Sequence, residues 1–153
     1  MPPDDEFKVR VQCERLVYKF LQVLEQDQAK VADLFAEDGQ AFALVGREKI
    51  REHFAAIAAV DDNVNVNLST NLLIDVDDED HARATNYVTH YVADREADDL
   101  TDPMGAPVGG ELQTARTITR WSWEFRRVDG EWLISRLRYP ESVLLRKDVI
   151  DQL

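Results

Sequence analysis

The stretch TITRWSWEFRRVDGEWLISRLRY at residues 117–139 contains the pattern that decides the fold. Polar and apolar side chains alternate on both sides of Asp129-Gly130, as they do in strands that bury one face of a sheet. The Asp-Gly dipeptide favours the two-residue turn of a tight hairpin. We therefore predict two long antiparallel strands at 111–128 and 131–139. Pro140 ends the second strand because it has no backbone N–H to donate.

Two more long strands are predicted before this hairpin. Alternation at 64–76 and again at 82–93 indicates a second antiparallel pair, joined by an acidic turn at 77–80. The segment 94–110 between the two pairs is rich in acidic residues, proline and glycine, which is typical of a loop. The four strands therefore follow one another as a meander.

The first third of the chain has helical periodicity instead. Apolar residues recur every three or four positions from Val9 to Leu24, and Asp38-Gly39 ends a second, short helix that buries Val31. We expect a short edge strand at 40–45 and a third helix that begins after Gly46. The result is an α+β fold in which three N-terminal helices pack on one face of an antiparallel sheet. Because three helices cannot cover four long strands evenly, a strongly curved sheet leaves an open mouth, which is a common place for a ligand.

Composition narrows the possible functions. The 153 residues are enough for one domain and too few for two. The chain has 18 Lys and Arg against 30 Asp and Glu, a net charge of −12, which argues against nucleic acid or an anionic membrane surface as partner. No run approaches the ~20 apolar residues of a membrane-spanning helix, and the acidic N-terminus is unlike a signal peptide, so we expect a soluble cytoplasmic protein. The single cysteine, Cys13, belongs to the apolar stripe of the first helix and is expected to be a buried, unreactive thiol.

Four short segments resemble a known family. They are Phe35-Ala36-Glu37-Asp38-Gly39, Gly46-Arg47-Glu48-Lys49-Ile50, Thr70-Asn71-Leu72-Leu73-Ile74-Asp75-Val76 and Asp129-Gly130-Glu131-Trp132-Leu133-Ile134-Ser135-Arg136. In this order, over residues 8–140, they resemble the SnoaL-like, nuclear-transport-factor-two-like superfamily. The resemblance implies a single domain at 1–153 with a C-terminal tail at 141–153. It also implies a cone-shaped sheet around a pocket, and often a homodimer formed through the sheet.

Members of this superfamily include enzymes and binding proteins, so the resemblance leaves the function open. The dehydratase branch uses an Asp–His dyad. Counting from the quoted segments places the Asp at Leu24, or at Glu25 with a one-residue slip, and the His at Asn67. Leucine and asparagine cannot exchange protons near neutral pH. The dyad is therefore absent, unless Glu25 and another group replace it.

The steroid isomerase branch uses two carboxylates, and these do not transfer either. Residues 40–45, where the first would lie, contain no acid. The second would lie on the third long strand, where Glu124 alternates with Trp121 and Trp123. If the tryptophans face the pocket, Glu124 faces away from it.

His90 is the strongest remaining candidate for acid–base chemistry, because an unperturbed imidazole titrates near neutral pH. The two faces of its strand are equally polar, so the alternation leaves open whether His90 faces a pocket or solvent. Tyr18 and Tyr91 are the candidate catalytic partners. For Tyr18, an exposed position on the first helix is the alternative.

The candidate ligand-binding residues are mostly aromatic. Trp121 and Trp123 share one strand face and form a flat wall suited to a ring, although packing in the core would give the same pattern. Phe54 lies on the inner face of the third helix, and Asn67 could orient a polar atom of a substrate. The sequence contains no Cys/His cluster, no phosphate loop and no complete calcium loop, so we expect no metal and no other cofactor.

We therefore expect a pocket for a small, largely apolar, cyclic molecule. If the protein is an enzyme, the expected reaction is a cofactor-free proton transfer of the lyase, isomerase or cyclase kind. The alternative is a non-catalytic structural subunit like the β subunits of ring-hydroxylating dioxygenases, which Arg136 followed by Val143-Leu144-Leu145 resembles loosely. A ligand carrier without turnover is a further alternative, consistent with the missing dyad.

Overall fold

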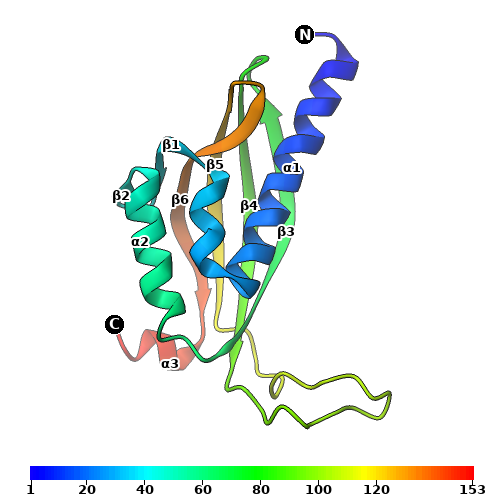
Figure 1. Cartoon of the computed structure of the whole chain (residues 1–153), viewed down its shortest axis with the longest axis vertical. Coiled ribbons are helices and arrows are strands. Elements are labelled where there is room, and N and C mark those ends of the chain that lie inside the picture. The colour runs from blue at the N-terminus through cyan, green and yellow to red at the C-terminus, as the bar shows by residue number, and fades with distance from the viewer.

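A six-stranded sheet is the frame on which the helices pack. In the computed structural model, which describes residues 1–153, the strands are β1 (Phe35–Ala41), β2 (Leu44–Val45), β3 (Val64–Val76), β4 (His81–Ala93), β5 (Thr117–Val128) and β6 (Glu131–Leu145). Their order is β2-β1-β6-β5-β4-β3, and the β1–β6 pair is parallel while the others are antiparallel. The helices are α1 (Pro3–Gln26), the 3-10 helix η1 (Gln28–Leu34), α2 (Arg47–Ala58) and the short α3 (Lys147–Ile150). Figure 1 shows α1, η1 and α2 on the same side of the sheet, which confirms the α+β class.

The meander predicted from the alternation is confirmed. β3 spans the predicted 64–76, and β4 begins one residue before the predicted 82–93. Asp129 and Gly130 have φ angles of 51° and 85°, as the tight two-residue hairpin requires. Local alternation and turn chemistry were therefore sufficient to locate these strands.

Two predicted strand limits are wrong. β5 begins at Thr117 rather than at residue 111, because the last β4–β5 pair is His90 with Thr117 and the residues before it have no strand partner. β6 continues through Pro140 to Leu145, which includes the first part of the expected tail. The register shifts between Arg120 and Ser122, so Pro140 falls in a bulge where the hydrogen-bond ladder is already interrupted.

The segment from residue 28 to residue 45 also differs from the prediction. The predicted short helix is a 3-10 helix at 28–34, but Asp38-Gly39 lies inside β1 instead of ending a helix. β1 pairs in parallel with β6, which lies far along the chain. Pairing with a strand so far along the chain produces no recognisable pattern in the local sequence. The prediction of a strand at 40–45 therefore included only the end of β1.

The core lies between the helices and the end of the sheet nearest the β5–β6 hairpin. Phe20 of α1 is fully buried at its centre. Its ring makes edge-on contacts with those of Phe35, Phe54, Trp121 and Trp123, at centroid distances of 5.3 to 6.5 Å. Burial of one such side chain contributes about 1.5–3 kcal/mol by transfer from water. This cluster holds α1 and α2 against the strands.

Cys13 of α1 belongs to the same core. Its side chain is fully buried, and burial raises the pKa of the thiol to about 12. The expectation of an unreactive thiol therefore has a structural reason. None of the helices combines the length and the apolar character needed to cross a bilayer.

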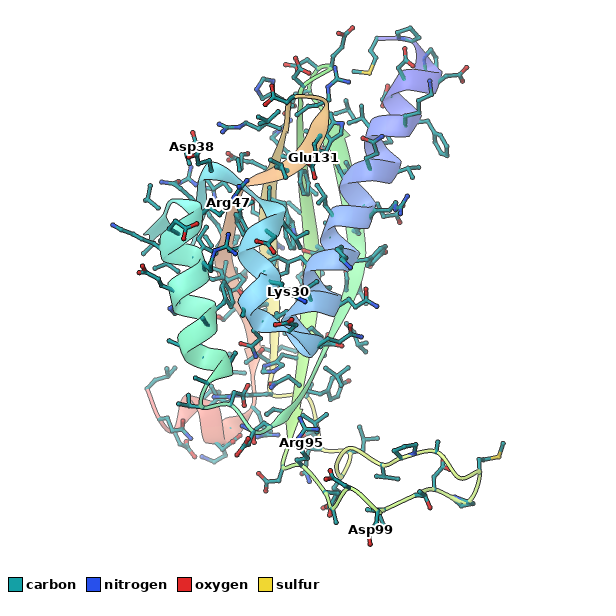
Figure 2. All side chains as sticks on the ribbon, in the orientation of Figure 1. Lys30, Asp38, Arg47, Arg95, Asp99 and Glu131 are labelled. Carbon is teal, nitrogen blue, oxygen red and sulfur yellow. The ribbon has the colours of Figure 1, made fainter.

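Charged side chains lie on several parts of the surface. Asp38 and Arg47 lie beside β1, while Arg95 and Asp99 lie on the loop that projects from the lower end of the molecule (Figure 2). Asp38 is exposed and pairs with Arg126, whose hydrogen bond lowers the pKa of the Asp38 carboxyl. The Arg47 guanidinium instead donates to the carbonyl oxygen of Phe35 at 2.8 Å and so ties α2 to β1.

Candidate functional site

A cavity of about 430 Å³ opens between the concave face of the sheet and the C-terminal ends of α1 and α2. Its size lies in the range usual for small-molecule sites. The apolar lining consists of Leu24, Phe54, Ile57, Val88, Val92, Trp121 and Tyr139. The polar lining consists of Gln28, Asp61, Asn63, Asn65, Asn67, His90, Arg116, Thr117 and Thr119. The cavity therefore offers an apolar surface together with several hydrogen-bonding groups.

Asp61, Asn65 and His90 form a hydrogen-bonded chain in this cavity. Asp61 precedes β3, Asn65 lies on β3, and His90 lies on the neighbouring β4. The amide Nδ2 of Asn65 donates to Oδ2 of Asp61 at 2.9 Å, and Oδ1 of Asn65 lies 2.8 Å from Nε2 of His90. An ionised carboxylate only accepts hydrogen bonds, so Asn65 must present its N–H group to Asp61 and its oxygen to His90.

This orientation determines the tautomer of His90. The amide oxygen of Asn65 can only accept, so Nε2 of His90 carries the hydrogen and Nδ1 of the neutral ring is the free acceptor. Nδ1 has no hydrogen-bond partner in the protein and is not fully buried, so it remains accessible. A neutral imidazole with an accessible Nδ1 can take a proton from a bound molecule.

Two pKa shifts agree with this assignment. Burial is the main reason why the pKa of His90 lies below its ordinary value of 6.5, and the positive charge of Arg116 adds to the effect. The negative charge of Asp61 opposes them without outweighing them. Burial alone would raise the pKa of Asp61, but hydrogen bonds led by those from Asn63 and Asn65 lower it below its usual 3.8. At neutral pH the cavity therefore contains a neutral imidazole and an ionised carboxylate.

Trp121 and Tyr139 form an aromatic wall in the cavity. Their ring centroids are 4.5 Å apart, and the ring of Tyr139 also contacts that of Phe42 at 4.1 Å. Phe42 has a φ of 55°, which is uncommon for a residue with a side chain, so the turn between β1 and β2 is strained where it supports Tyr139. The wall gives a flat surface on which a planar ring can pack.

The structure brings several of the candidate residues together. His90, Asn67, Trp121 and Phe54 all line the cavity. Trp123, the other expected ligand contact, is fully buried in the core and is not part of the cavity surface. Its indole N–H donates to the side chain of Asn86 at 2.9 Å, which satisfies the one polar group it has. Trp123 therefore lies in the core next to Trp121, with ring centroids 5.5 Å apart, and does not contact a ligand itself.

The two candidate catalytic tyrosines lie away from the cavity. Tyr18 is 48% exposed in an open groove between α1 and the β5–β6 hairpin. That groove is larger than the cavity, about 1080 Å³, but it is an open depression bordered by charged side chains such as Arg15 and Lys19. Tyr91 alternates with His90 along β4 and pairs with Val66, so it lies on the convex face of the sheet. Neither tyrosine is part of the cavity lining, which corrects the expectation from the sequence.

The positions expected for the dehydratase dyad also meet in the cavity. Leu24 and Asn67 both line it, although neither side chain can exchange a proton. Glu25 does not replace the missing acid, because its carboxylate accepts the backbone N–H of Asn67 and is not part of the lining. Glu124 is not part of the lining either, and its Oε1 lies 3.7 Å from a guanidinium nitrogen of Arg138.

Sequence reasoning missed Asp61, Asn65 and Arg116. A signal was present at 63–67, where asparagines alternate with valines. The asparagines face the cavity, while Val66 on the other face is 38% exposed. A strand that turns its polar face inward indicates a hydrated cavity rather than a packed core, because buried polar groups need partners.

Comparison with solved structures shows a shared fold. A protein from Novosphingobium aromaticivorans, provisionally described as a scytalone dehydratase, superposes with a TM-score of 0.65 at 18% identity, over 94% of this chain and 93% of its own. A provisionally described aromatic ring hydroxylase from the same species gives 0.63 at 21% identity, over 97% of each chain. A protein of unknown function with a cystatin-like fold from Nostoc punctiforme gives 0.62 at 20% identity, over 89% of this chain and 95% of its own.

Comparison with families of sequences is more specific. The SnoaL-like domain family matches residues 5–138, which is most of the chain. A comparison with curated proteins gives no match. At these low identities the solved structures show the fold alone, whereas the family match covers the chain from α1 into β6. The protein therefore belongs to the SnoaL-like domain family.

Proposed function

We propose that the cavity binds a small, largely apolar cyclic molecule and that His90 moves a proton to or from it, without a cofactor. The reaction would be of the lyase, isomerase or cyclase kind. The observation that carries this proposal is the Asp61–Asn65–His90 chain, which leaves Nδ1 of a neutral imidazole accessible in a partly apolar cavity. Positioned acid–base groups of this kind typically accelerate a reaction by about 10²–10⁴-fold.

The geometry suggests how the step would proceed. Nδ1 of His90 accepts a proton from a C–H group of the ligand, and the ring becomes an imidazolium. The electron pair left on the carbon forms a double bond or expels a leaving group. Asn65 stabilises the imidazolium through its oxygen, and Asp61 strengthens this bond by accepting from the same amide. The imidazolium can then return its proton to another atom of the product.

The elimination of 5-nitrobenzisoxazole tests this proposal directly. A base removes the C–H proton of the isoxazole ring. The C–H electron pair then forms the third bond of a nitrile, and the N–O bond breaks to give a coloured phenolate. We expect the protein to exceed the buffer rate by at least about 100-fold. The rate should rise with pH through a pKa below 6.5. The readout is the absorbance of the phenolate.

The matched control for this assay is a second histidine. His90→Ala should lose most of the rate, whereas His81→Ala should retain it, because His81 lies exposed in the turn between β3 and β4 beside Asp78. Circular dichroism of both variants shows whether the fold is retained. Equal rates for the wild type and a folded His90→Ala variant would exclude His90 as the base.

A ligand carrier is the second candidate. The positions at which the resemblance places the dyad carry Leu24 and Asn67, which are neither acids nor bases, and this favours binding without turnover. A carrier would bind 5-nitrobenzisoxazole, detectable by calorimetry, and would release the phenolate only at the buffer rate.

We also propose that a second copy of the chain covers the convex face of the sheet. Register pairs place Leu68, Thr89, Ile118 and Leu144 in one row across β3, β4, β5 and β6. Leu68 and Leu144 are 50% and 61% exposed there. The row carries no charge although the chain is strongly acidic, so it suits association of the face with itself.

Light scattering tests the proposed homodimer. The wild type should have twice the mass of the chain, and Leu68→Asp should have the mass of one chain because it places a charge in the row. Leu112→Asp is the matched control, since Leu112 is 88% exposed on the loop before β5 and lies outside the row. A wild type that is monomeric at all concentrations would contradict the proposal.

A further inference from the structure

Arg116 is a charged side chain in the cavity that has no partner in the protein. Most arginines of this acidic chain form ion pairs, and Arg146 at the same end of the molecule pairs with Asp148 at 2.6 Å. The guanidinium of Arg116 forms neither an ion pair nor a hydrogen bond, although it lines the cavity. The Arg116 backbone is held in place, because its N–H donates to the carbonyl oxygen of His90 at 2.7 Å.

Asp61, the acid of the cavity, is already engaged elsewhere. Its Oδ1 accepts the backbone N–H and the amide of Asn63, both at 3.0 Å. Its Oδ2 accepts the amides of Asn65 at 2.9 Å and Gln28 at 3.5 Å. The positive charge of Arg116 is therefore left for a ligand.

The position of Arg116 indicates where that ligand would carry its negative charge. Arg116 lines both the cavity and an outer groove of about 630 Å³, so it lies at the mouth. From there, Thr117, Thr119 and Trp121 follow one another on the cavity face of β5. The hydroxyl groups of Thr117 and Thr119 form no hydrogen bonds in the protein, so they can donate to the same ligand. At about 3.3 Å per residue, the distance along β5 from Thr117 to Trp121 is about 13 Å.

We propose, building on the proposed function of the cavity, that its ligand is an aromatic or cyclic carboxylic acid. The carboxylate binds the guanidinium of Arg116 at the mouth, and the ring packs on Trp121. Arginine presents two parallel N–H groups that match the two oxygens of a carboxylate. His90 pairs in register with Thr117, so it lies level with the part of the ligand between the carboxylate and the ring.

Calorimetry with 2-naphthoate and its neutral analogue 2-naphthamide tests this inference. The two probes share the ring and differ in charge. We expect wild type to bind 2-naphthoate at least about ten-fold more tightly than 2-naphthamide, which is typical of a charge-assisted hydrogen-bonded pair. Arg116→Gln should remove this preference without changing the affinity for the amide, and Arg116→Lys should retain part of it.

Arg95→Gln is the matched control. Arg95 is an exposed arginine on the projecting loop (Figure 2), and its replacement makes the same change in net charge. It should leave the preference unchanged. Equal affinity of wild type for the two probes, or a preference that survives Arg116→Gln, would overturn the inference. Tighter binding of 2-naphthyl phosphate than of 2-naphthoate would overturn it in favour of a phosphate ligand.

These outcomes separate the inference from the proposed function on which it rests. The elimination assay uses a neutral substrate and depends on His90, so it reports on the base and the cavity alone. Binding of the amide without any preference for the acid would reject the carboxylate ligand and leave the proposed function in place. Failure of both naphthyl probes and of the elimination assay would reject both.

Discussion

The two ends of the concave sheet face differ sharply, although the same four strands form both. Near the β5–β6 hairpin, the side chains of Trp123, Phe125 and Ile134 pack in the hydrophobic core and are at most 1% exposed. At the other end the same face presents Asn65, His90 and other polar groups to a cavity. In Figure 1, α1 ends before β3 and β4 reach this end.

This difference teaches how the fold makes a site. Where a helix covers the strands, the concave face is apolar and fills the space, as protein interiors do. Where the helices stop, asparagine, threonine and histidine replace the apolar residues. Such groups can be hydrated in the empty cavity and can bind a ligand when it enters. Substitutions at the packed end and at the cavity end should therefore change the stability of the protein in different ways.

The packed end should show the largest effect. Phe20→Ala removes the ring that contacts those of Phe35, Phe54, Trp121 and Trp123, so the free energy of unfolding should fall by about 3–5 kcal/mol. Ile57→Ala, at the partly exposed cavity surface, should lower it by less than about 2 kcal/mol. Urea unfolding of both variants gives the two values. Equal losses would show that the two ends are packed alike.

The cavity end should show a smaller effect that depends on pH. The pKa of His90 is lowered in the folded protein, whereas in the unfolded chain its pKa is about 6.5. As the pH falls through about 6.5 toward the folded pKa, the unfolded chain takes up the proton first, so the free energy of unfolding decreases. Asp61 titrates below its usual 3.8 and therefore contributes nothing in this window.

Comparison with His90→Gln isolates this contribution. Urea unfolding at about pH 7.5 and about pH 5.5 should show a larger loss of stability for the wild type than for the variant. The exposed His53 and His81 are present in both proteins and cancel. A loss of the same size in both proteins would mean that His90 is not buried in its neutral form.

The smallest effect is expected outside both regions. Asp38 pairs with Arg126 on the surface, where the Asp38 side chain is 70% exposed. Asp38→Asn should change the free energy of unfolding by less than about 1 kcal/mol, since water and salt screen such pairs. It should also leave the elimination rate unchanged, because Asp38 is not part of the cavity lining. A loss of more than about 1 kcal/mol that is the same at low and at high salt would assign Asp38 a structural role beyond this ion pair.

Much of the fold could be predicted from local sequence patterns. The alternation at 64–76 and 82–93 and the turn at Asp129-Gly130 all depend on neighbouring residues, so no distant contact was needed to find them. β1 and the end of β6 were less accessible to prediction. Their limits depend on the parallel pairing of the two strands and on the bulge at Pro140, which are contacts between distant parts of the chain.

The candidate site was predictable only in part. The aromatic residue Trp121 and the titratable residue His90 were found by residue type, and both line the cavity. Tyr18 and Tyr91 were chosen by the same reasoning and lie elsewhere, because residue type does not reveal which face of an element is turned inward.

By itself, the sequence determined that this protein has N-terminal helices, a long meander and an acidic surface, since periodicity, turn residues and charge are properties of the chain. Only the tertiary structure decided that His90 rather than Tyr91 faces the cavity. The register between β3 and β4 brings Asn65 to His90, and the loop after α2 brings Asp61 to Asn65. Arg116 was left unpaired beside them by the same packing. Such hydrogen bonds and charges act over a few ångströms, so they form only where the fold brings distant residues together.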